Sequence, residues 1–285
     1  MEKRYHPKWK LLLGLLTIIS MSLQAAEQVQ RVFPVSKNPT VSVLNYSGLT
    51  SVKGWQNPQV KAICTKYSQN VRIETNSNGN SVGISTHVLD RLASPENVKV
   101  DCQILIPEES NMEIRSNLGD VTVENIKGDM IIDVVNAQVR VAGVTGRIDA
   151  KSLGSKLEIA KSKGTVRTNT VSGDIFLSHV DSDSVTASST LGNIVYEGIF
   201  LNGGKYNFSS NEGEITIQCT HDPSVRWDAR TFKGNIENNL PTKLEAVRSS
   251  LRGGPGKQFL LGTTHSGKAT VQLSTFSGRI QINHK

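Results

Sequence analysis

The side chains best suited to catalysis in this sequence are acidic and histidine residues, and they are scattered. Asp181-Ser182-Asp183 places two carboxylates close together, as a polysaccharide-cleaving enzyme requires for its acid and base. His221-Asp222 contains two members of a hydrolytic triad, but no nucleophile stands at an identifiable spacing. We therefore interpret the first segment as a solvated turn on a loop and the second as a surface turn. No catalytic residue is predicted.

Metal and cofactor sites are also not indicated. His87, His179 and His265 are isolated from other metal-ligating residues, so we predict no metal site. Residues 252–257 are rich in glycine and end in lysine, like a phosphate-binding loop. The spacing of that motif is missing, however, and Gln258 stands where its metal-binding hydroxyl should be. We interpret this stretch as a flexible loop and predict no cofactor.

Three cysteines lie on apolar faces of predicted strands. Cys64 and Cys102 both continue an alternating apolar pattern in the N-terminal region, so both point inward. If their strands are neighbours, a disulfide could join them in an oxidising compartment, and two buried free thiols are the alternative. Cys219 continues the apolar face of Ile215 and Ile217 and is expected to pack in the core.

The first 26 residues have the pattern of a secretory signal peptide. A basic start is followed by an apolar stretch at 11–23 and by the small residues Ala25-Ala26. A retained transmembrane anchor is the alternative. Thirteen helical residues rise only about 20 Å, however, against a hydrocarbon core of about 30 Å. We expect a protein of the periplasm or cell surface, with no integral membrane segment after cleavage.

The charge of the chain gives a weak indication about partners. Removing residues 1–26 takes away four basic residues and one acidic residue, so the net charge falls from +7 to +4. This mildly basic balance gives weak support for anionic partners such as lipopolysaccharide or peptidoglycan. Nucleic acid is not expected, because lysine and arginine are scattered and not interleaved with aromatic residues.

An internal repeat is the most informative feature of the sequence. A small residue, here called the marker, recurs at steps of 18, then 19 and 21 residues. The residues two positions after each marker are all aliphatic, and most of those four positions after it are apolar, which is typical of a strand with one buried face. The markers are Gly119, Ala137, Ser155, Gly173, Gly192, Gly213 and Gly234.

Other columns of the repeat complete one coil. Serine or threonine stands three positions before nearly every marker, and a half-period at Gly128, Gly146 and Gly164 adds a second strand. We therefore predict an all-β fold, a parallel β-solenoid (β-helix) of about 18-residue coils. Its seven or eight coils would have an aliphatic core and a hydroxyl ladder. A calcium-binding roll is not expected, because each turn offers at most one acidic residue.

The sequence on either side of the strict repeat departs from it. Residues 27–110 do not follow the repeat but contain five predicted strands, and we expect them to form a β-rich cap on the N-terminal edge. The repeat region is 111–285, with a loop insertion near 239–269. The motif then returns at 275–282, which we interpret as the closing coil. The predicted strands of the cap are 41–44, 52–55, 60–64, 71–73 and 98–106.

Several motifs resemble one known family. Asn45-Tyr46-Ser47-Gly48 with Val52-Lys53-Gly54-Trp55 resembles the opening of the LiaG-like "putative adhesin" family of bacterial β-strand repeat proteins. Ile104-Leu105-Ile106-Pro107 resembles the start of its repeats, and 170–175 and 275–282 resemble its T-x-S-G-x-I signature. The resemblance covers roughly residues 40–285 and implies an envelope-associated protein. It implies no biochemical activity.

We therefore expect an exported, non-enzymatic β-repeat protein that acts as a binding or adhesin-like module. Its partner would be an envelope protein or a glycan, because solenoids present long, regular outer faces. A polysaccharide-active β-helix enzyme is one alternative, and a regulatory partner in the envelope stress response is the other.

Overall fold

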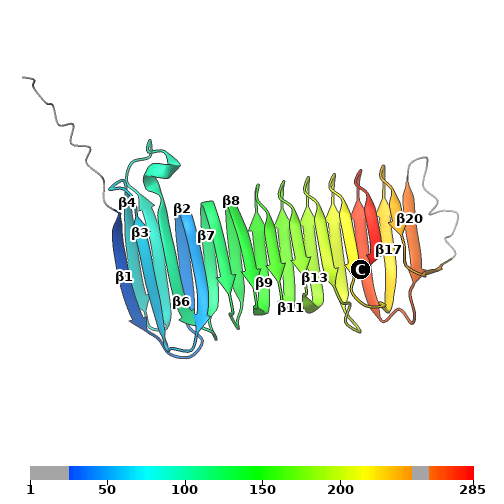
Figure 1. The fold of residues 1–285 in the computed structure, drawn as a ribbon, viewed down its shortest axis with the longest axis horizontal. Coiled ribbons are helices and arrows are strands. Elements are labelled where there is room, and N and C mark those ends of the chain that lie inside the picture. The colour runs from blue at the N-terminus through cyan, green and yellow to red at the C-terminus, as the bar shows by residue number, and fades with distance from the viewer. Residues whose placement is uncertain (1–25, 246–256) are drawn as a thin grey trace, which may run out of the picture.

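The protein is an all-β rod (Figure 1). The computed structural model describes residues 26–245 and 257–285. The predicted signal peptide and most of the glycine-rich stretch at 252–257 therefore lie outside the described residues. Among those residues the single helical segment is the 3-10 turn η1 (Pro95–Val98). No helix in the described parts of the chain is long and apolar enough to cross a membrane.

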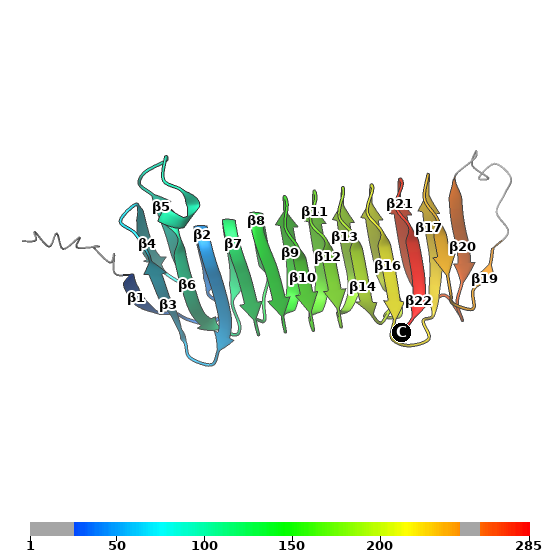
Figure 2. The same cartoon turned by 45° about the horizontal axis from the view of Figure 1, so that its top comes forward.

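The strands form one continuous sheet that folds into two facing layers, which run along the length of the rod (Figure 2). Three long strands, β2 (Thr40–Trp55), β7 (Asn111–Glu124) and β8 (Met130–Ala142), contribute their first half to one layer and their second half to the other. The first layer otherwise contains, in spatial order, β4 (Val71–Asn78), β5 (Ser81–Val88), then β9 (Thr145–Ser152), β11 (Lys163–Thr170), β13 (Asp181–Ser189), β15 (Lys205–Ser210), β21 (Ala269–Thr275), β17 (Val225–Thr231), β20 (Gln258–Thr263) and β19 (Lys243–Leu244). The second layer contains β1 (Glu27–Pro34), β3 (Gln59–Lys66), β6 (Val100–Pro107), then β10 (Leu157–Ala160), β12 (Ile175–Ser178), β14 (Ile194–Gly198), β16 (Ile215–Cys219), β22 (Ile280–His284) and β18 (Ile236–Asn238).

Equivalent residues of successive coils stack directly on one another. Leu157 pairs with Val139 on one side and Ile175 on the other, each eighteen residues away along the chain. The side chains two positions after the marker are fully buried from Val121 to Ile215. These parallel columns form the continuous aliphatic core that the sequence predicts.

The serine and threonine column explains the turn between the two layers. Ser210 Oγ accepts a hydrogen bond of 2.9 Å from the backbone N–H of Gly213 and donates one of 3.0 Å to the carbonyl of Gly192 in the preceding coil. The Ser210 hydroxyl thus closes its own turn and also ties it to the preceding coil, and such a bond contributes about 1 kcal/mol. A Cβ on Gly213 would lie 2.0 Å from the Gly192 carbonyl oxygen, so close stacking requires the glycine there.

The repeat begins earlier than the sequence indicates. β2 pairs with β7 in parallel from Thr40 to Lys53, with Gly48 beside Gly119. The expectation that residues 27–110 do not follow the repeat is therefore wrong for β2, which forms a first coil. Its period is hidden in the sequence because the antiparallel strands β3 to β6 intervene before β7.

The C-terminal motif does not close the rod. β21 lies between β15 and β17, and β22 lies between β16 and β18 (Figure 1). The outer neighbour of β17 is β20, which pairs with it in the antiparallel direction. The interpretation of 275–282 as the closing coil is wrong, because residues that fit the columns fit any place in the stack.

Candidate binding site

A cleft of about 570 Å³ lies at the N-terminal part of the rod, where four connections between strands converge. These are residues 35–38 before β2, 56–58 after it, 107–109 between β6 and β7, and Lys127 between β7 and β8. Turns meet here because the strands of the cap and of the first coils end at the same side of the sheet. We call this feature the turn cleft.

Trp55 is the aromatic wall of the turn cleft. It is the last residue of β2 and is half-buried, and its Nε1–H donates a hydrogen bond of 2.8 Å to the carbonyl of Gln59. The Trp55 carbonyl accepts a bond of 3.0 Å from the Glu108 N–H, which joins the turn after β2 to the end of β6. The hydrogen bond to Gln59 therefore holds the indole of Trp55, a residue that lines the cleft.

The polar wall of the cleft is an ordered charged group. Lys127 Nζ lies 3.0 Å from Glu108 Oε2, and Gln56 Nε2 donates to Glu108 Oε1 at 2.5 Å. The hydrogen bonds from Lys127 and Gln56 lower the pKa of Glu108, and the bond to Glu108 raises the pKa of Lys127. Both side chains are therefore charged at neutral pH.

This arrangement suits binding better than glycoside hydrolysis. A hydrolase needs a carboxylic acid whose pKa is raised, so that it holds its proton until transfer. The pKa of Glu108 moves in the opposite direction. An aromatic side chain, amide side chains and charged groups are the groups that orient a bound ligand in a cleft.

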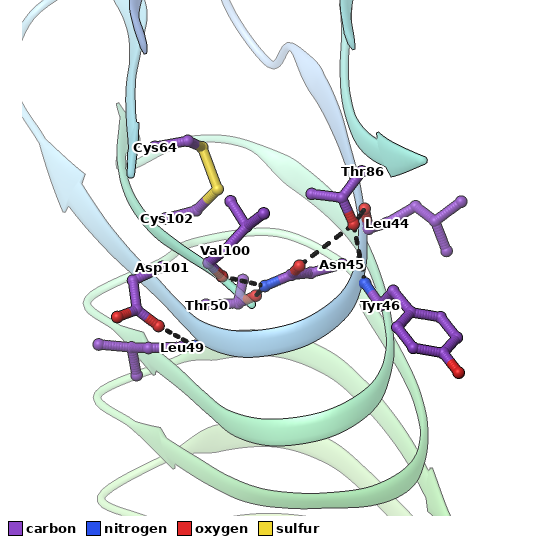
Figure 3. The surroundings of a disulfide bond; sticks show 10 residues. All are labelled: Leu44, Asn45, Tyr46, Leu49, Thr50, Cys64, Thr86, Val100, Asp101 and Cys102. Atoms are coloured by element: carbon purple, nitrogen blue, oxygen red, sulfur yellow. Dashed lines mark hydrogen bonds between the residues drawn. A yellow bond between two sulfur atoms is a disulfide. The ribbon is translucent and has the colours of Figure 1, made fainter. Parts of the chain in front are cut away.

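The two cysteines of the cap lie directly opposite each other in the antiparallel pair of β3 and β6 (Figure 3). Both are buried, and the Sγ atoms of Cys64 and Cys102 are 2.04 Å apart, joined as a disulfide. β6 carries Cys102 beside Thr50 of β2. The bridge therefore ties an outer strand of the cap to the strand that contacts the first coil.

Asn45 is the second junction between cap and coil (Figure 3). It is fully buried on β2 in the column that holds serine or threonine in later coils. Its Nδ2 donates to the Val100 carbonyl at 2.9 Å and to Thr50 Oγ1 at 3.2 Å, and its Oδ1 accepts from Thr86 Oγ1 at 3.2 Å. One side chain thus joins β2 to both β5 and β6.

The residues singled out in the sequence for catalysis do not come together. Asp181 and Asp183 are exposed at the start of β13, not on a loop, while Ser182 between them is buried. Asp222 lies 3.5 Å from His284, and its neighbour His221 contacts Thr220. The hydroxyl beside His221, Thr220 Oγ1, lies at the exposed surface, and Ser182 between the two aspartates is buried.

The remaining histidines and the third cysteine are also dispersed. His87 lies 3.1 Å from Glu74 and His179 lies 3.8 Å from Glu197, while His265 is exposed in a turn. Over the described residues, no group of three or more potential ligands could hold a metal ion. Burial of Cys219 raises the pKa of its thiol to about 12, consistent with a packed, unreactive side chain.

Sequence reasoning did not single out the turn cleft. Its lining comes from four separate connections, and no motif links Trp55 to Lys127 along the chain. The available signal was the position of Trp55, an aromatic residue at the end of a strand and directly before the polar turn Gln56-Asn57-Pro58.

Two solved structures and one family profile are similar to this chain. Over 92% of this chain, the structure is similar to a "putative adhesin" from Bacteroides fragilis, with 12% identity, 99% of that chain covered and a TM-score of 0.51. A "putative cell adhesion protein" from Clostridium sporogenes covers 92% of this chain and 100% of its own, with 15% identity and a TM-score of 0.29. No curated protein matches the sequence. The profile of the Toastrack DUF4097 family matches residues 45–283, and the chain therefore belongs to this family.

Proposed function

We propose that the protein is an exported, non-enzymatic binding module of the bacterial envelope, with the turn cleft as its ligand site. In this proposal residues 1–26 are a cleaved signal peptide, and the strands of 27–110 other than β2 form the cap. β2 and residues 111–285 form a β-solenoid of about 18-residue coils with an insertion near 239–269. The Cys64–Cys102 bridge forms after export. The ligand is a glycan or another envelope protein.

The observation that carries this proposal is the ordered lining of the turn cleft. Trp55 offers a fixed apolar face, while Glu108 and Lys127 offer fixed opposite charges in a volume of about 570 Å³. Such a cleft loses little conformational entropy when it binds a ligand. The names of the similar structures and the resemblance to the LiaG-like family support an adhesin-like role on the cell surface.

Calorimetric titration with cell-wall glycan fragments and with purified envelope proteins tests this function. For the ligand that binds, Trp55→Ala should weaken affinity by roughly tenfold or more, because a truncated aromatic anchor costs about 2 kcal/mol. Trp55→Phe keeps an aromatic face and should lose less. Tyr67→Ala removes an exposed aromatic ring elsewhere on the cap and serves as the matched control.

Two results would contradict the proposal. One is a ligand of the intact protein whose affinity is the same for Trp55→Ala and the wild type. The other is catalysis: release of new reducing ends from a polysaccharide by protein freed of contaminating activity would establish the enzyme alternative instead.

A further inference from the structure

Positive charge is concentrated in the C-terminal part of the sequence. Residues 226–285 contain ten lysines and arginines and three aspartates and glutamates, a net charge of +7. Residues 27–225 contain eighteen lysines and arginines and twenty-one aspartates and glutamates, a net charge of −3. β17 and β20 to β22, which carry part of this charge, lie together near one end (Figure 1). The net charge of +4 for residues 27–285 hides this asymmetry.

Two phenylalanine rings are exposed at the same end. Phe232 and Phe276 stack with centroids 5.1 Å apart and planes at 9°, and 41% and 44% of each residue is exposed. They become neighbours because β21 pairs alongside β17, with Thr231 beside Thr275. The stacked pair therefore gives this edge of the rod a small apolar face that is open to solvent.

Two lysines lie over these rings without an acidic partner. Lys257 Nζ is 4.6 Å from the centre of the Phe232 ring, and Lys233 Nζ is 5.3 Å from the centre of the Phe276 ring. Within the described residues neither lysine has a carboxylate within 4 Å, whereas Arg226, Arg230, Arg279 and Lys285 of the same end all lie in ion pairs. Residues 246–256 contain no aspartate or glutamate in their sequence. These two cations are therefore available to an anionic ligand.

A cavity of about 310 Å³ adjoins the ring pair. Its size is at the lower end of the range for small-molecule sites. It combines an apolar wall, hydroxyl groups and the cationic side chain of Lys257, while Arg230 is paired with Asp228. This combination suits a ligand with apolar ring faces, hydroxyls and a negative charge. The residues that matter here are Phe232, Phe259, Leu261, Ser274, Arg230 and Lys257.

The face of the first layer beside this cavity carries neutral hydrogen-bonding groups. Ser188, Ser209 and Ser274 stand side by side on β13, β15 and β21, and Ser209 Oγ donates to Ser188 Oγ at 3.0 Å. Two positions earlier on the same three strands, the neighbouring column of outward-facing side chains holds Thr186, Asn207 and Gln272. A lipid surface would desolvate these groups without replacing their hydrogen bonds, whereas the hydroxyls of a sugar chain can pair with them.

We propose that the C-terminal end of the rod binds an acidic polysaccharide. Lys233 and Lys257 pair with its carboxylates, a sugar ring contacts the Phe232–Phe276 edge, and the chain continues along the column that ends at Ser274. This inference goes beyond the proposed function, because it names a ligand class and uses residues remote from the turn cleft.

The test compares two forms of one polymer. Polygalacturonate and its fully methyl-esterified form differ in charge but share a backbone, and their affinities for the full-length protein can be measured by calorimetry. We expect binding of the acidic form only, weakening as salt is added. Lys233→Ala/Lys257→Ala should lower the affinity by roughly tenfold or more. The control Lys243→Ala/Lys268→Ala removes equal charge from the same end and should change it by less than about threefold.

Phe232→Leu/Phe276→Leu tests the aromatic contribution while keeping apolar side chains, and melting curves establish that each variant is folded. The proposal is overturned if polygalacturonate does not bind. It is also overturned if Lys233→Ala/Lys257→Ala and Lys243→Ala/Lys268→Ala lower the affinity for polygalacturonate equally. It is also overturned if phosphatidylglycerol vesicles bind through Lys233 and Lys257 and the polysaccharide does not. Trp55→Ala should leave this binding intact, so failure of the turn cleft and failure of this site remain distinguishable.

Discussion

The cap and the coils bury the same kind of aliphatic side chain but join their strands in different ways. In β9 to β16 each strand lies parallel to its equivalents, and identical columns stack on themselves. In the cap, β1, β3 and β6 pair in the antiparallel direction, as do β4 and β5. A parallel coil leaves an open edge that accepts another coil, so a rod needs an irregular end to stop the stacking.

The two regions also use polar side chains differently. In most coils one hydroxyl closes the turn, as Ser210 does, and the same bond recurs from coil to coil. At the equivalent position in the cap, Asn45 makes bonds to β2, β5 and β6. The repetition of the coils therefore distributes stability over many equal contacts, whereas the cap depends on a few contacts that occur once.

The largest expected loss of stability comes from a substitution that disrupts a buried column of the coils. Ile175→Asp places a charge in a fully buried column between Leu157 and Ile194, where no cation is in register with it. We expect a loss of at least about 4 kcal/mol and a protein that does not fold. Ser178→Asp, on the same strand but half-buried and facing outward, is the control. An Ile175→Asp variant with wild-type circular dichroism and melting would show that the column assignment is wrong.

The next effect concerns the cap alone. Cys64→Ala/Cys102→Ala removes a bridge that closes a 38-residue separation, and such a loss typically costs about 2–4 kcal/mol. Reductant should lower the melting temperature of the wild type and leave that of the double variant unchanged. Thiol counting on the unfolded, non-reduced protein should find one free cysteine, Cys219. Three free thiols, with melting unaffected by reductant, would exclude the bridge.

The coils could be predicted from the sequence because stacking makes the same demand at each turn. Every coil needs an aliphatic residue two positions after the marker, so seven aligned residues reveal the strand and its buried face. The residue types of a column do not indicate, however, which coil of the stack a segment forms. The motif at 275–282 has the right types for a coil, and nothing in those types says that it lies between β16 and β18.

The cap and the candidate sites could be predicted less well, because they depend on contacts that occur once. The inward direction of Cys64 and Cys102 follows from strand alternation, but their pairing depends on the β3–β6 register, which no local pattern encodes. Trp55 and Lys127 become neighbours only after four turns converge. Phe232 and Phe276 each stand two positions before a marker-type glycine, and this shared position was a usable signal for their stacking.

A smaller loss of stability distinguishes the buried Asn45 side chain from the turn-closing hydroxyls of the coils. Asn45→Ala leaves the Val100 carbonyl and the Thr86 hydroxyl short of buried partners and should cost about 2–3 kcal/mol. Ser210→Ala removes one hydroxyl of the ladder and should cost about 1 kcal/mol. Denaturant unfolding measures both values. Hydrogen exchange should quicken in β5 and β6 for the first variant and locally around the Ser210 turn for the second. If both variants lost the same free energy of unfolding, Asn45 would contribute no more to stability than one hydroxyl of the coils.

The smallest effect is the pH dependence of the turn cleft. The pKa of Glu108 lies below its usual value of 4.5, so its contribution to stability is present above pH 4.5 and is lost as the pH falls through the lowered pKa. The pKa of Lys127 lies above its usual value of 10.5, so its contribution is present below pH 10.5 and is lost as the pH rises through the raised pKa. The ion pair is therefore complete between these limits, and its exposure keeps the effect small.

Glu108→Gln separates this contribution from the general acid sensitivity of the fold. Stability of the wild type, measured by urea unfolding, should fall more steeply below pH 4.5 than that of Glu108→Gln, because only the wild type must protonate a paired carboxylate. Glu124→Gln is a suitable control, since Glu124 is more exposed and lies 3.9 Å from Lys53. If Glu108→Gln and Glu124→Gln have the same acid profile, the ordered charge in the turn cleft is no different from an ordinary surface pair. The cap would then lack the preorganised wall on which its role in binding rests.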